Sequence, residues 1–262
     1  MRESLTSTIS RDVPPARPLV AEKKTYVPHS APEEFIVPLL RREIEMSIER
    51  FATPALGLRR AIDIGSGGQP FRSLLEQIGY DYCAVDVNST EGPVHVQCAI
   101  DGPLPEELMH RGPFDFALCT EVLEHVADWG AAFANLASLL ASGGRVLVTT
   151  PHFYHLHEEP YDFWRPTLHA IAHYARGAGL EPVYQHCAGN AWGVLGTALG
   201  SCQFTAASGG LTDRVLAKAV RDIQRIVFAT LRAGRVQRRV KADARLYLSN
   251  IVVLQKGQHV EA

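Results

Sequence analysis

The stretch Ala61-Ile62-Asp63-Ile64-Gly65-Ser66-Gly67-Gly68-Gln69-Pro70 decides the fold. It opens with an apolar run of strand length. The glycines that follow let the backbone turn tightly and approach a ligand without a Cβ atom in the way. A carboxylate at Asp63, near the end of the strand, suits an ammonium group better than a pyrophosphate. A dinucleotide enzyme would usually show G-x-G-x-x-G, whereas position 70 is Pro.

A second carboxylate follows the next apolar run. Asp86 comes about 20 residues after the glycine turn, where an acidic side chain can accept hydrogen bonds from both ribose hydroxyls. The glycine turn alone would also fit a tight turn that binds nothing. The two carboxylates together favour a nucleoside ligand with a cationic group.

The alternation of strand and helix continues along the chain. Strand-length apolar runs lie at residues 82–85, 94–98, 114–119 and 145–150, with helical stretches at 70–78 and 128–140. We expect Gly143-Gly144 to end the second helix. A helix at 168–177, a strand at 181–186 and a last strand at 246–254 follow. This order is typical of a parallel, doubly wound α/β sheet.

The composition along the chain divides it into four expected parts. Residues 1–30, rich in Pro, Ser, Thr and Arg, are expected to form a flexible N-terminal arm, and a helix follows Pro32. Residues 31–188 form the core. Residues 189–241 form an insertion with a Gly-rich entry, an amphipathic stretch at 211–231 and a basic run. Residues 242–262 hold the last strand and tail.

Composition limits the kinds of partner. The 262 residues carry a net charge of −2, so no overall field attracts nucleic acid or an anionic membrane, and any such attraction must come from a local patch. The five cysteines form no CxxC pair. No apolar run approaches the roughly 20 residues of a membrane span. Residues 1–24 lack the apolar core of a signal peptide, so we expect a cytoplasmic protein without integral membrane contact.

Asp63-Ile64-Gly65-Ser66-Gly67 resembles motif I of the class I S-adenosylmethionine-dependent methyltransferases, D-x-G-x-G-x-G, with Gln69 at the third glycine position. The variant D-I-G-S-G-x-x-P resembles a bacterial branch associated with small molecules and sugars. The resemblance continues in order through the stretches at 82–87, 98–105, 114–126, 142–151 and 157–167. It implies a seven-stranded, mostly parallel, Rossmann-like sheet with an antiparallel last strand and a helical insertion before it.

The resemblance also implies which residues bind S-adenosylmethionine. Asp63 and the backbone of Gly65, Ser66 and Gly67 would hold the methionine end. Asp86 would accept hydrogen bonds from the ribose hydroxyls, and Val87 would pack against the adenine. Asp101, beside Gly102, would accept a hydrogen bond from the adenine amino group. Thr120 and Glu121 would line the methionine moiety near the sulfonium.

Acceptor-side candidates gather after the fifth strand, at the carboxyl edge beside the cofactor: His152, His155, His157, Glu158, Glu159 and Asp162. An imidazole titrates at about 6.5, which suits a general base, and His157 matches the family's H-x-x-P-x-D-x-x-R pattern. Asp162 or Glu159 would orient its ring. The same groups could instead ligate a divalent metal, position a substrate, or stitch the loop together. Because their spacing matches no metal motif, we expect no metal.

We therefore expect methyl transfer from S-adenosylmethionine to a small-molecule acceptor, a hydroxyl of a sugar or natural product. His157, Asp162, His152 and His155 are the catalytic candidates. N- or C-methylation of a natural product, and a cofactor-binding pseudoenzyme or scaffold, are the alternatives. No nucleic-acid partner is expected. The insertion is expected to close over the acceptor side or form a homodimer contact. Its stretch at 211–241 could instead be a basic surface for a phosphate-bearing or membrane-associated acceptor, or a solvated helix that covers the sheet edge.

Overall fold

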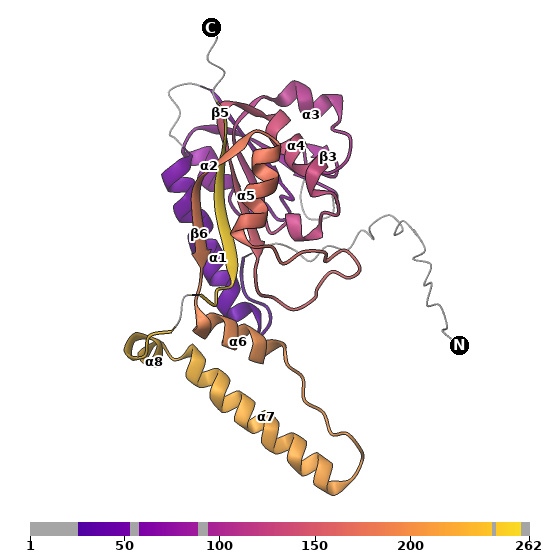
Figure 1. Cartoon of the computed structure of the whole chain (residues 1–262), viewed down its shortest axis with the longest axis vertical. Helices are drawn as coiled ribbons and strands as arrows, with labels where there is room; N and C mark the ends of the chain where they lie inside the picture. Colours follow the sequence, from indigo (N-terminus) through magenta and orange to yellow (C-terminus); the bar gives the residue numbers. More distant parts are fainter. Residues whose placement is uncertain (1–25, 53–57, 89–93, 243–244, 258–262) are drawn as a thin grey trace, which may run out of the picture.

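The computed structural model describes residues 26–52, 58–88, 94–242 and 245–257 (Figure 1). Its centre is a seven-stranded sheet in the order β3-β2-β1-β4-β5-β7-β6. The strands are β1 (Arg59–Ile64), β2 (Tyr80–Asp86), β3 (Val96–Gln97), β4 (Phe114–Thr120), β5 (Leu140–Pro151), β6 (Leu180–Ala188) and β7 (Ser249–Lys256). All neighbours pair in parallel except β7, which is antiparallel to both β5 and β6. The predicted fold class is confirmed.

Helices cover both faces of the sheet. One face packs against α1 (Glu33–Phe51) and α2 (Arg72–Gln77), and the other against α3 (Glu106–Arg111), α4 (Trp129–Leu139) and α5 (Leu168–Gly177). Alternation along β1 divides the two cores, because Ala61 faces the first and Ile62 and Ile64 face the second. With both faces buried, the central strand β4 is apolar along most of its length, whereas the edge strand β6 carries exposed polar side chains.

The glycine pair in β5 has a different role from the one expected. α4 ends at Leu139 and β5 begins at Leu140, so Gly143-Gly144 lies inside the strand and does not end the helix. The register between β4 and β5 shifts between Phe114 and Phe116, which is a β-bulge. A Cβ atom on Gly144 would lie 2.9 Å from the carbonyl oxygens of both Ala141 and Phe114. The glycine therefore allows the close backbone approach that the bulge needs.

The insertion between β6 and β7 is helical throughout much of its length. It contains α6 (Ala191–Ser201), α7 (Leu211–Arg232) and α8 (Gly234–Arg239). The amphipathic stretch predicted at 211–231 matches α7. The Gly-rich entry was not recognised as a helix, because glycine has a low helix propensity. Here Gly196 and Gly200 let α6 approach Phe35 and Pro32 at the start of α1 more closely than any other residue could.

A single methyl group tests the bulge. We expect Gly144→Ala to lower the free energy of unfolding by about 1–3 kcal/mol, because its Cβ meets backbone atoms that cannot rotate away. Gly177→Ala is the control, since nothing lies within 4 Å of a Cβ at that position. Chemical denaturation of both variants would measure the difference. Equal stability of the two variants would show that the bulge tolerates a side chain.

Candidate active site

The turn after β1 has the backbone that its glycines predict. Gly65 and Gly67 adopt φ angles of +67° and +46°. A Cβ atom on Gly65 would overlap the side chain of Val122. Gln69, at the third glycine position of the family motif, also has a positive φ, of 56°. Its backbone N–H donates to the Ser66 carbonyl at 2.7 Å, which holds the turn despite the missing glycine.

Asp63 is a buried carboxylate beside this turn. Its side chain accepts a hydrogen bond of 2.6 Å from the Tyr82 hydroxyl on the neighbouring strand. Burial, and then the negative charge of Asp63, raises the pKa of Tyr82, so this phenol remains a donor. A buried carboxylate at this position favours a cationic ligand group nearby.

Asp86 closes the turn from the end of β2. One carboxylate oxygen accepts the Gly67 N–H at 2.9 Å, and the other accepts the Asn88 N–H at 3.0 Å. A carboxylate has about four lone-pair sites, so two backbone bonds leave capacity for two hydroxyl donors. Val87 follows at the same edge, and its carbonyl accepts from Gln97.

Asp101 and Gly102 lie on the loop between β3 and α3. The Asp101 carboxylate accepts from the Asp128 N–H at 3.4 Å. The Asn135 side chain donates to the carbonyls of Ile100 and Gly102, at 2.7 and 2.8 Å. The loop is thus fastened to α4, with both predicted residues half-buried.

Thr120 and Glu121 follow β4 at the point where the chain leaves the sheet. Glu121 has φ +51°, a left-handed conformation that is uncommon for a residue with a side chain. Its carboxylate accepts from the Thr149 hydroxyl at 2.8 Å, and its N–H donates to the Thr149 carbonyl at 3.0 Å. These contacts hold the strained residue at the carboxyl edge, where such strain is typical of functional sites.

Tyr26 was missed by the sequence reasoning. It falls within the expected flexible arm, yet it is buried, its hydroxyl donates to the Thr120 hydroxyl at 3.1 Å, and its ring packs edge-on against Phe71. Burial first, and then the negative charge of Glu121, raises the pKa of its phenol. The arm prediction is wrong at this residue, because a lone aromatic among polar residues carries no periodic signal.

The loop after β5 is organised around Asp162. Arg165 donates to both of its oxygens, at 2.6 and 2.7 Å, and the His157 N–H donates at 2.9 Å. Although burial alone raises the pKa of Asp162, these bonds outweigh it and hold the pKa below the ordinary value. Asp162 is therefore ionised and accepts from His157 Nδ1 at 3.1 Å. Arg165 Nη2 lies 3.5 Å from the same nitrogen, a weaker contact.

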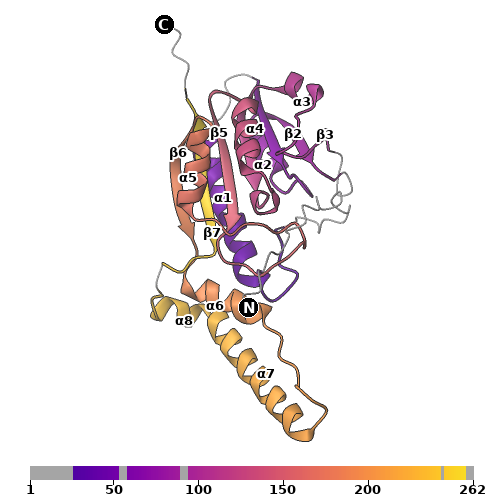
Figure 2. The same ribbon diagram turned by 45° about the vertical axis from the view of Figure 1, so that its right-hand side comes forward.

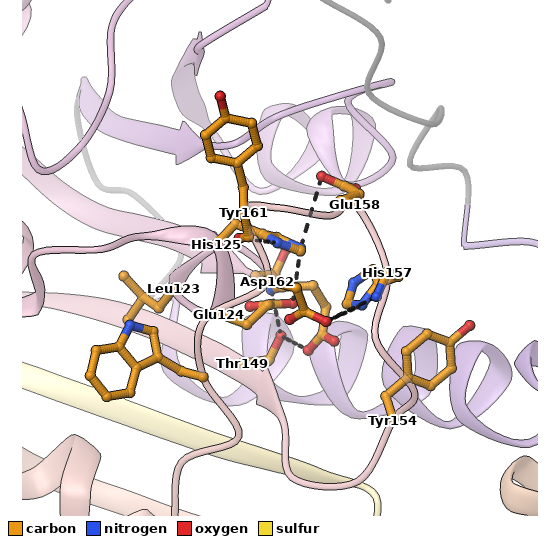
Figure 3. Close-up of polar contacts among 12 residues, drawn as sticks. Leu123, Glu124, His125, Thr149, Tyr154, His157, Glu158, Tyr161 and Asp162 are labelled. Atoms are coloured by element: carbon orange, nitrogen blue, oxygen red, sulfur yellow. Dashed lines mark hydrogen bonds and ion pairs between the residues drawn. The ribbon is translucent and has the colours of Figure 1, made fainter. Parts of the chain in front are cut away.

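Further acids and a second histidine lie beside His157, as Figure 3 shows. His125 ends the short 3₁₀ turn η1 (Leu123–His125). Its Nδ1 is 3.1 Å from the Tyr161 carbonyl, and its Nε2 is 3.8 Å from Glu124 and 4.0 Å from Glu158. Potential ligand atoms of Glu124, His125 and His157 lie within 4.8 Å of one another, so these residues could hold a divalent metal.

The other two histidines of the loop have structural contacts. His152 stacks on Tyr247 with ring centroids 4.1 Å apart, and its Nδ1 lies 2.9 Å from the Pro166 carbonyl. His155 Nδ1 lies 2.9 Å from the hydroxyl of Ser201 on α6. Burial, followed by the charge of His157, lowers the pKa of His155. The His155 ring also lies edge-on to the His157 ring, with centroids 6.5 Å apart, so His155 borders the His125–His157 cluster.

Comparison with known proteins identifies the family. Residues 39–186, more than half of the chain, match the family model described as "Methyltransferase domain". The chain belongs to the class I S-adenosylmethionine-dependent methyltransferases. The predicted family and cofactor are confirmed.

Curated relatives of this methyltransferase match over part of their length. A ubiquinone biosynthesis O-methyltransferase from Caulobacter sp. (strain K31) is 36% identical over 108 residues, which cover 37% of this chain and 42% of the relative. One from Xanthomonas axonopodis pv. citri (strain 306) is 30% identical over 101 residues, covering 35% and 42%. The chain thus spans under half the length of these relatives.

Solved structures share the fold at low sequence identity. Haemonchus contortus phosphoethanolamine N-methyltransferase 2, in complex with phosphomonomethylethanolamine and S-adenosylhomocysteine, is 17% identical with a TM-score of 0.50, over 83% of this chain and 53% of that one. The [4+2]-cyclase SpnF is 15% identical with the same TM-score, over 84% and 81%. These likenesses establish the architecture of the methyltransferase sheet.

The Asp162–Arg165 pair gives a stability prediction. We expect Asp162→Asn to lower the free energy of unfolding by about 2 kcal/mol at neutral pH, below the range of fully buried pairs because the Arg165 side chain is 23% exposed. The folded-state pKa of Asp162 is depressed, so the contribution is complete above the ordinary carboxyl pKa of about 3.9. It is lost as the pH falls from there through the lower folded-state pKa.

Thermal melts of the wild type, Asp162→Asn and Glu159→Gln from about pH 7 down to pH 2 would measure this. The exposed Glu159 on the same loop serves as the matched control. A stability difference that disappears well above the ordinary carboxyl range, or that Glu159→Gln reproduces, would contradict the assignment.

Proposed function

We propose that this methyltransferase transfers a methyl group from S-adenosylmethionine to a hydroxyl of a small molecule. The observation that carries the proposal is His157: its ring is oriented by an ionised, buried carboxylate and lies beside the carboxyl edge of the sheet. The curated relatives are named as O-methyltransferases, which supports oxygen as the methylated atom. Residues 31–188 would form the catalytic core.

The residues at the strand ends fit the cofactor. Asp63 and Glu121 supply negative charge for a molecule that carries an ammonium and a sulfonium group, and the 61–70 stretch contains no Lys or Arg to hold a phosphate. Asp86 keeps acceptor capacity for the ribose hydroxyls. The remaining predicted contacts, from Gly65, Ser66 and Gly67 and from Val87, Asp101, Gly102 and Thr120, lie along the same edge. S-adenosylmethionine supplies an electrophilic methyl group when bound.

The acceptor needs alignment and, for a weakly acidic hydroxyl, a base. Because Asp162 is ionised and only accepts hydrogen bonds, the proton of the His157 ring belongs on Nδ1. The lone pair is then on Nε2, which can take the hydroxyl proton as methyl transfer proceeds. Asp162 orients the ring and stabilises its charged form, while Arg165 holds Asp162 in place.

Other roles for this cluster are favoured by specific contacts. The proximity of Glu124, His125 and His157 favours a divalent ion as the activator of the hydroxyl, in place of the histidine base. Substrate positioning without proton transfer is a third reading. The contacts of His152 with Tyr247 and Pro166 favour a loop-stabilising role for that residue.

The loop after β5 exposes large apolar side chains beside its histidines. Phe153, Leu156, Phe163 and Trp164 are exposed large side chains on the loop after β5. Flat faces of this kind suit a sugar ring or an aromatic natural product, which supports these classes as the acceptor. The names of the curated relatives point to a ubiquinone precursor as a further member of the aromatic class. N- or C-methylation and a non-catalytic scaffold are the alternatives.

The cofactor assignment is tested by binding. We expect S-adenosylmethionine and its demethylated product to bind and NAD not to bind in calorimetry. Asp86→Ala should weaken the binding of both by about 1–3 kcal/mol, the scale of hydrogen bonds to a charged group. Asp81→Ala, an exposed carboxylate at the opposite end of β2, is the matched control. Binding of NAD alone would refute the assignment.

The base assignment is tested by turnover. We expect His157→Ala to lower turnover by about 10²–10⁴-fold while cofactor affinity and melting temperature stay near the wild type. His169→Ala, an exposed histidine on α5, is the control. A panel of phenolic and sugar acceptors would identify the substrate class.

Exhaustive chelation separates the base from the metal. Full activity after chelation supports the base. Activity that is lost on chelation and restored by Mg²⁺ or Mn²⁺ would assign the hydroxyl activation to an ion at Glu124, His125 and His157. Equal loss of cofactor affinity and stability in His157→Ala would make the residue structural.

A further inference from the structure

Helix α7 contacts the rest of the protein mainly along one row of residues. Beside this row, Arg221 donates to the Phe204 carbonyl and Arg232 pairs with Glu34. In the row itself, Ala217 and Leu231 are buried, Gln224 donates to the carbonyls of Leu199 and Cys202, and Phe228 packs edge-on against Phe35. These positions recur at helical spacing, so they share one face. The rest of the helix extends away from the sheet domain in both views (Figures 1 and 2).

A second face of α7 is apolar and exposed. We define the α7 apolar face by its large exposed side chains: Val215, Leu216, Val220, Ile223, Ile226 and Val227. Leu216 and Ile223 are 60% and 61% exposed, and Ile226 is 67% exposed. A patch of this extent along 22 residues is more than scattered surface leucines, and such patches mark an interaction site.

A third face of α7 is basic. Arg214, Lys218, Arg221 and Arg225 recur at helical spacing, about half a turn of the helix away from Leu216. Lys218 and Arg225 are 73% and 78% exposed and share a single acidic partner, Asp222. The charge continues through α8 to Lys241. Residues 211–241 hold nine Lys and Arg against two Asp, in a chain whose net charge is −2.

We propose that the α7 apolar face docks onto the surface of a bilayer that contains anionic lipids. An interfacial helix combines the last two of these features, an apolar face and a cationic polar face. Such a helix buries its apolar face at the boundary of headgroups and acyl chains, while Lys and Arg lie within a Debye length of the anionic headgroups. In the described part of the chain, no helix is long and apolar enough to span a membrane.

Charge favours the bilayer over a second copy of the chain. Two apolar faces paired across a two-fold axis would bring two segments together that each carry this excess of Lys and Arg. Such pairing would cover the apolar faces but leave the basic faces, half a turn away, without acidic partners, because Asp213 and Asp222 are the only acids in 211–241. An anionic surface is attracted by the same charge. An anionic bilayer is therefore the occupant that matches both the apolar face and the basic face of α7.

Helix α7 is connected to the loop after β5 through α6. α7 packs on α6, and Ser201 of α6 lies 2.9 Å from His155 Nδ1 in the loop after β5. The membrane proposal does not depend on methyl transfer, because it concerns the surface of the insertion alone.

Vesicle flotation with the full-length protein tests the proposal. We expect the protein to float with phosphatidylcholine vesicles that contain about 30 mol % phosphatidylglycerol, and to bind pure phosphatidylcholine vesicles at least about tenfold more weakly. Leu216→Ser/Ile223→Ser should lower the partition by about tenfold or more, and Arg214→Gln/Lys218→Gln should lower it on anionic vesicles alone. The matched controls are Leu58→Ser, 77% exposed on the sheet domain, and Arg176→Gln, 59% exposed on α5.

Several outcomes would overturn the proposal. In one, the protein does not float with vesicles, and light scattering shows a dimer that the Leu216→Ser/Ile223→Ser variant converts to a monomer. This result would assign the α7 apolar face to a second copy of the chain. Binding that ignores lipid charge, or that Leu58→Ser impairs equally, would remove the role of α7. Unchanged melting temperatures for all four variants show that each result reports on docking and not on folding. Calorimetry with S-adenosylmethionine on the same variants shows whether the cofactor site is intact, independently of docking.

Discussion

The parallel pairing of β1 with β2 and β4 is the constraint on which the site depends. Asp63 pairs in register with Ala84 on one side and with Leu118 on the other. This register brings the ends of three strands to one edge, and with them Asp86, Thr120 and the glycine turn. A slip of one residue would turn Asp63 toward the opposite core and replace it with an apolar side chain. The chemistry of the site is therefore fixed by backbone hydrogen bonds.

The same edge concentrates negative charge. Asp63, Glu121 and Glu124 all act on the phenol of Tyr26, which burial keeps neutral. Acids gathered at one buried edge repel one another, so their arrangement is stabilised by donors from several parts of the chain: the Tyr82 hydroxyl, the Thr149 hydroxyl and backbone N–H groups. A cation at this edge would relieve the repulsion, which accounts for why a phosphate-free, positively charged cofactor matches the fold of this family.

The parts that the sequence predicted are those with local signals. The glycine turn and Asp86 lie within one strand–helix–strand unit, and the β5 loop carries its histidines and Asp162 within eleven residues. Long-range contacts left no such trace. The Tyr26–Thr120 bond joins residues 94 positions apart, and the glycines of α6 fit closely against the start of α1. The pairing of His125 with His157 likewise depends on how two loops meet. The roles of individual residues in binding the cofactor and the acceptor stay predictions.

The insertion is closed at its base by a short bridge. The Leu248 N–H donates to the Ala188 carbonyl at 2.9 Å, and the Leu248 carbonyl accepts from His152 at 2.7 Å. Everything between Ala188 and Leu248 therefore leaves the sheet and returns to it at the same point. The entropy of closing a loop grows only with the logarithm of its length, so this segment can be lengthened, shortened or exchanged at little cost to the sheet. Proteins of this family can therefore keep the sheet that carries the cofactor site and differ in the insertion between β6 and β7.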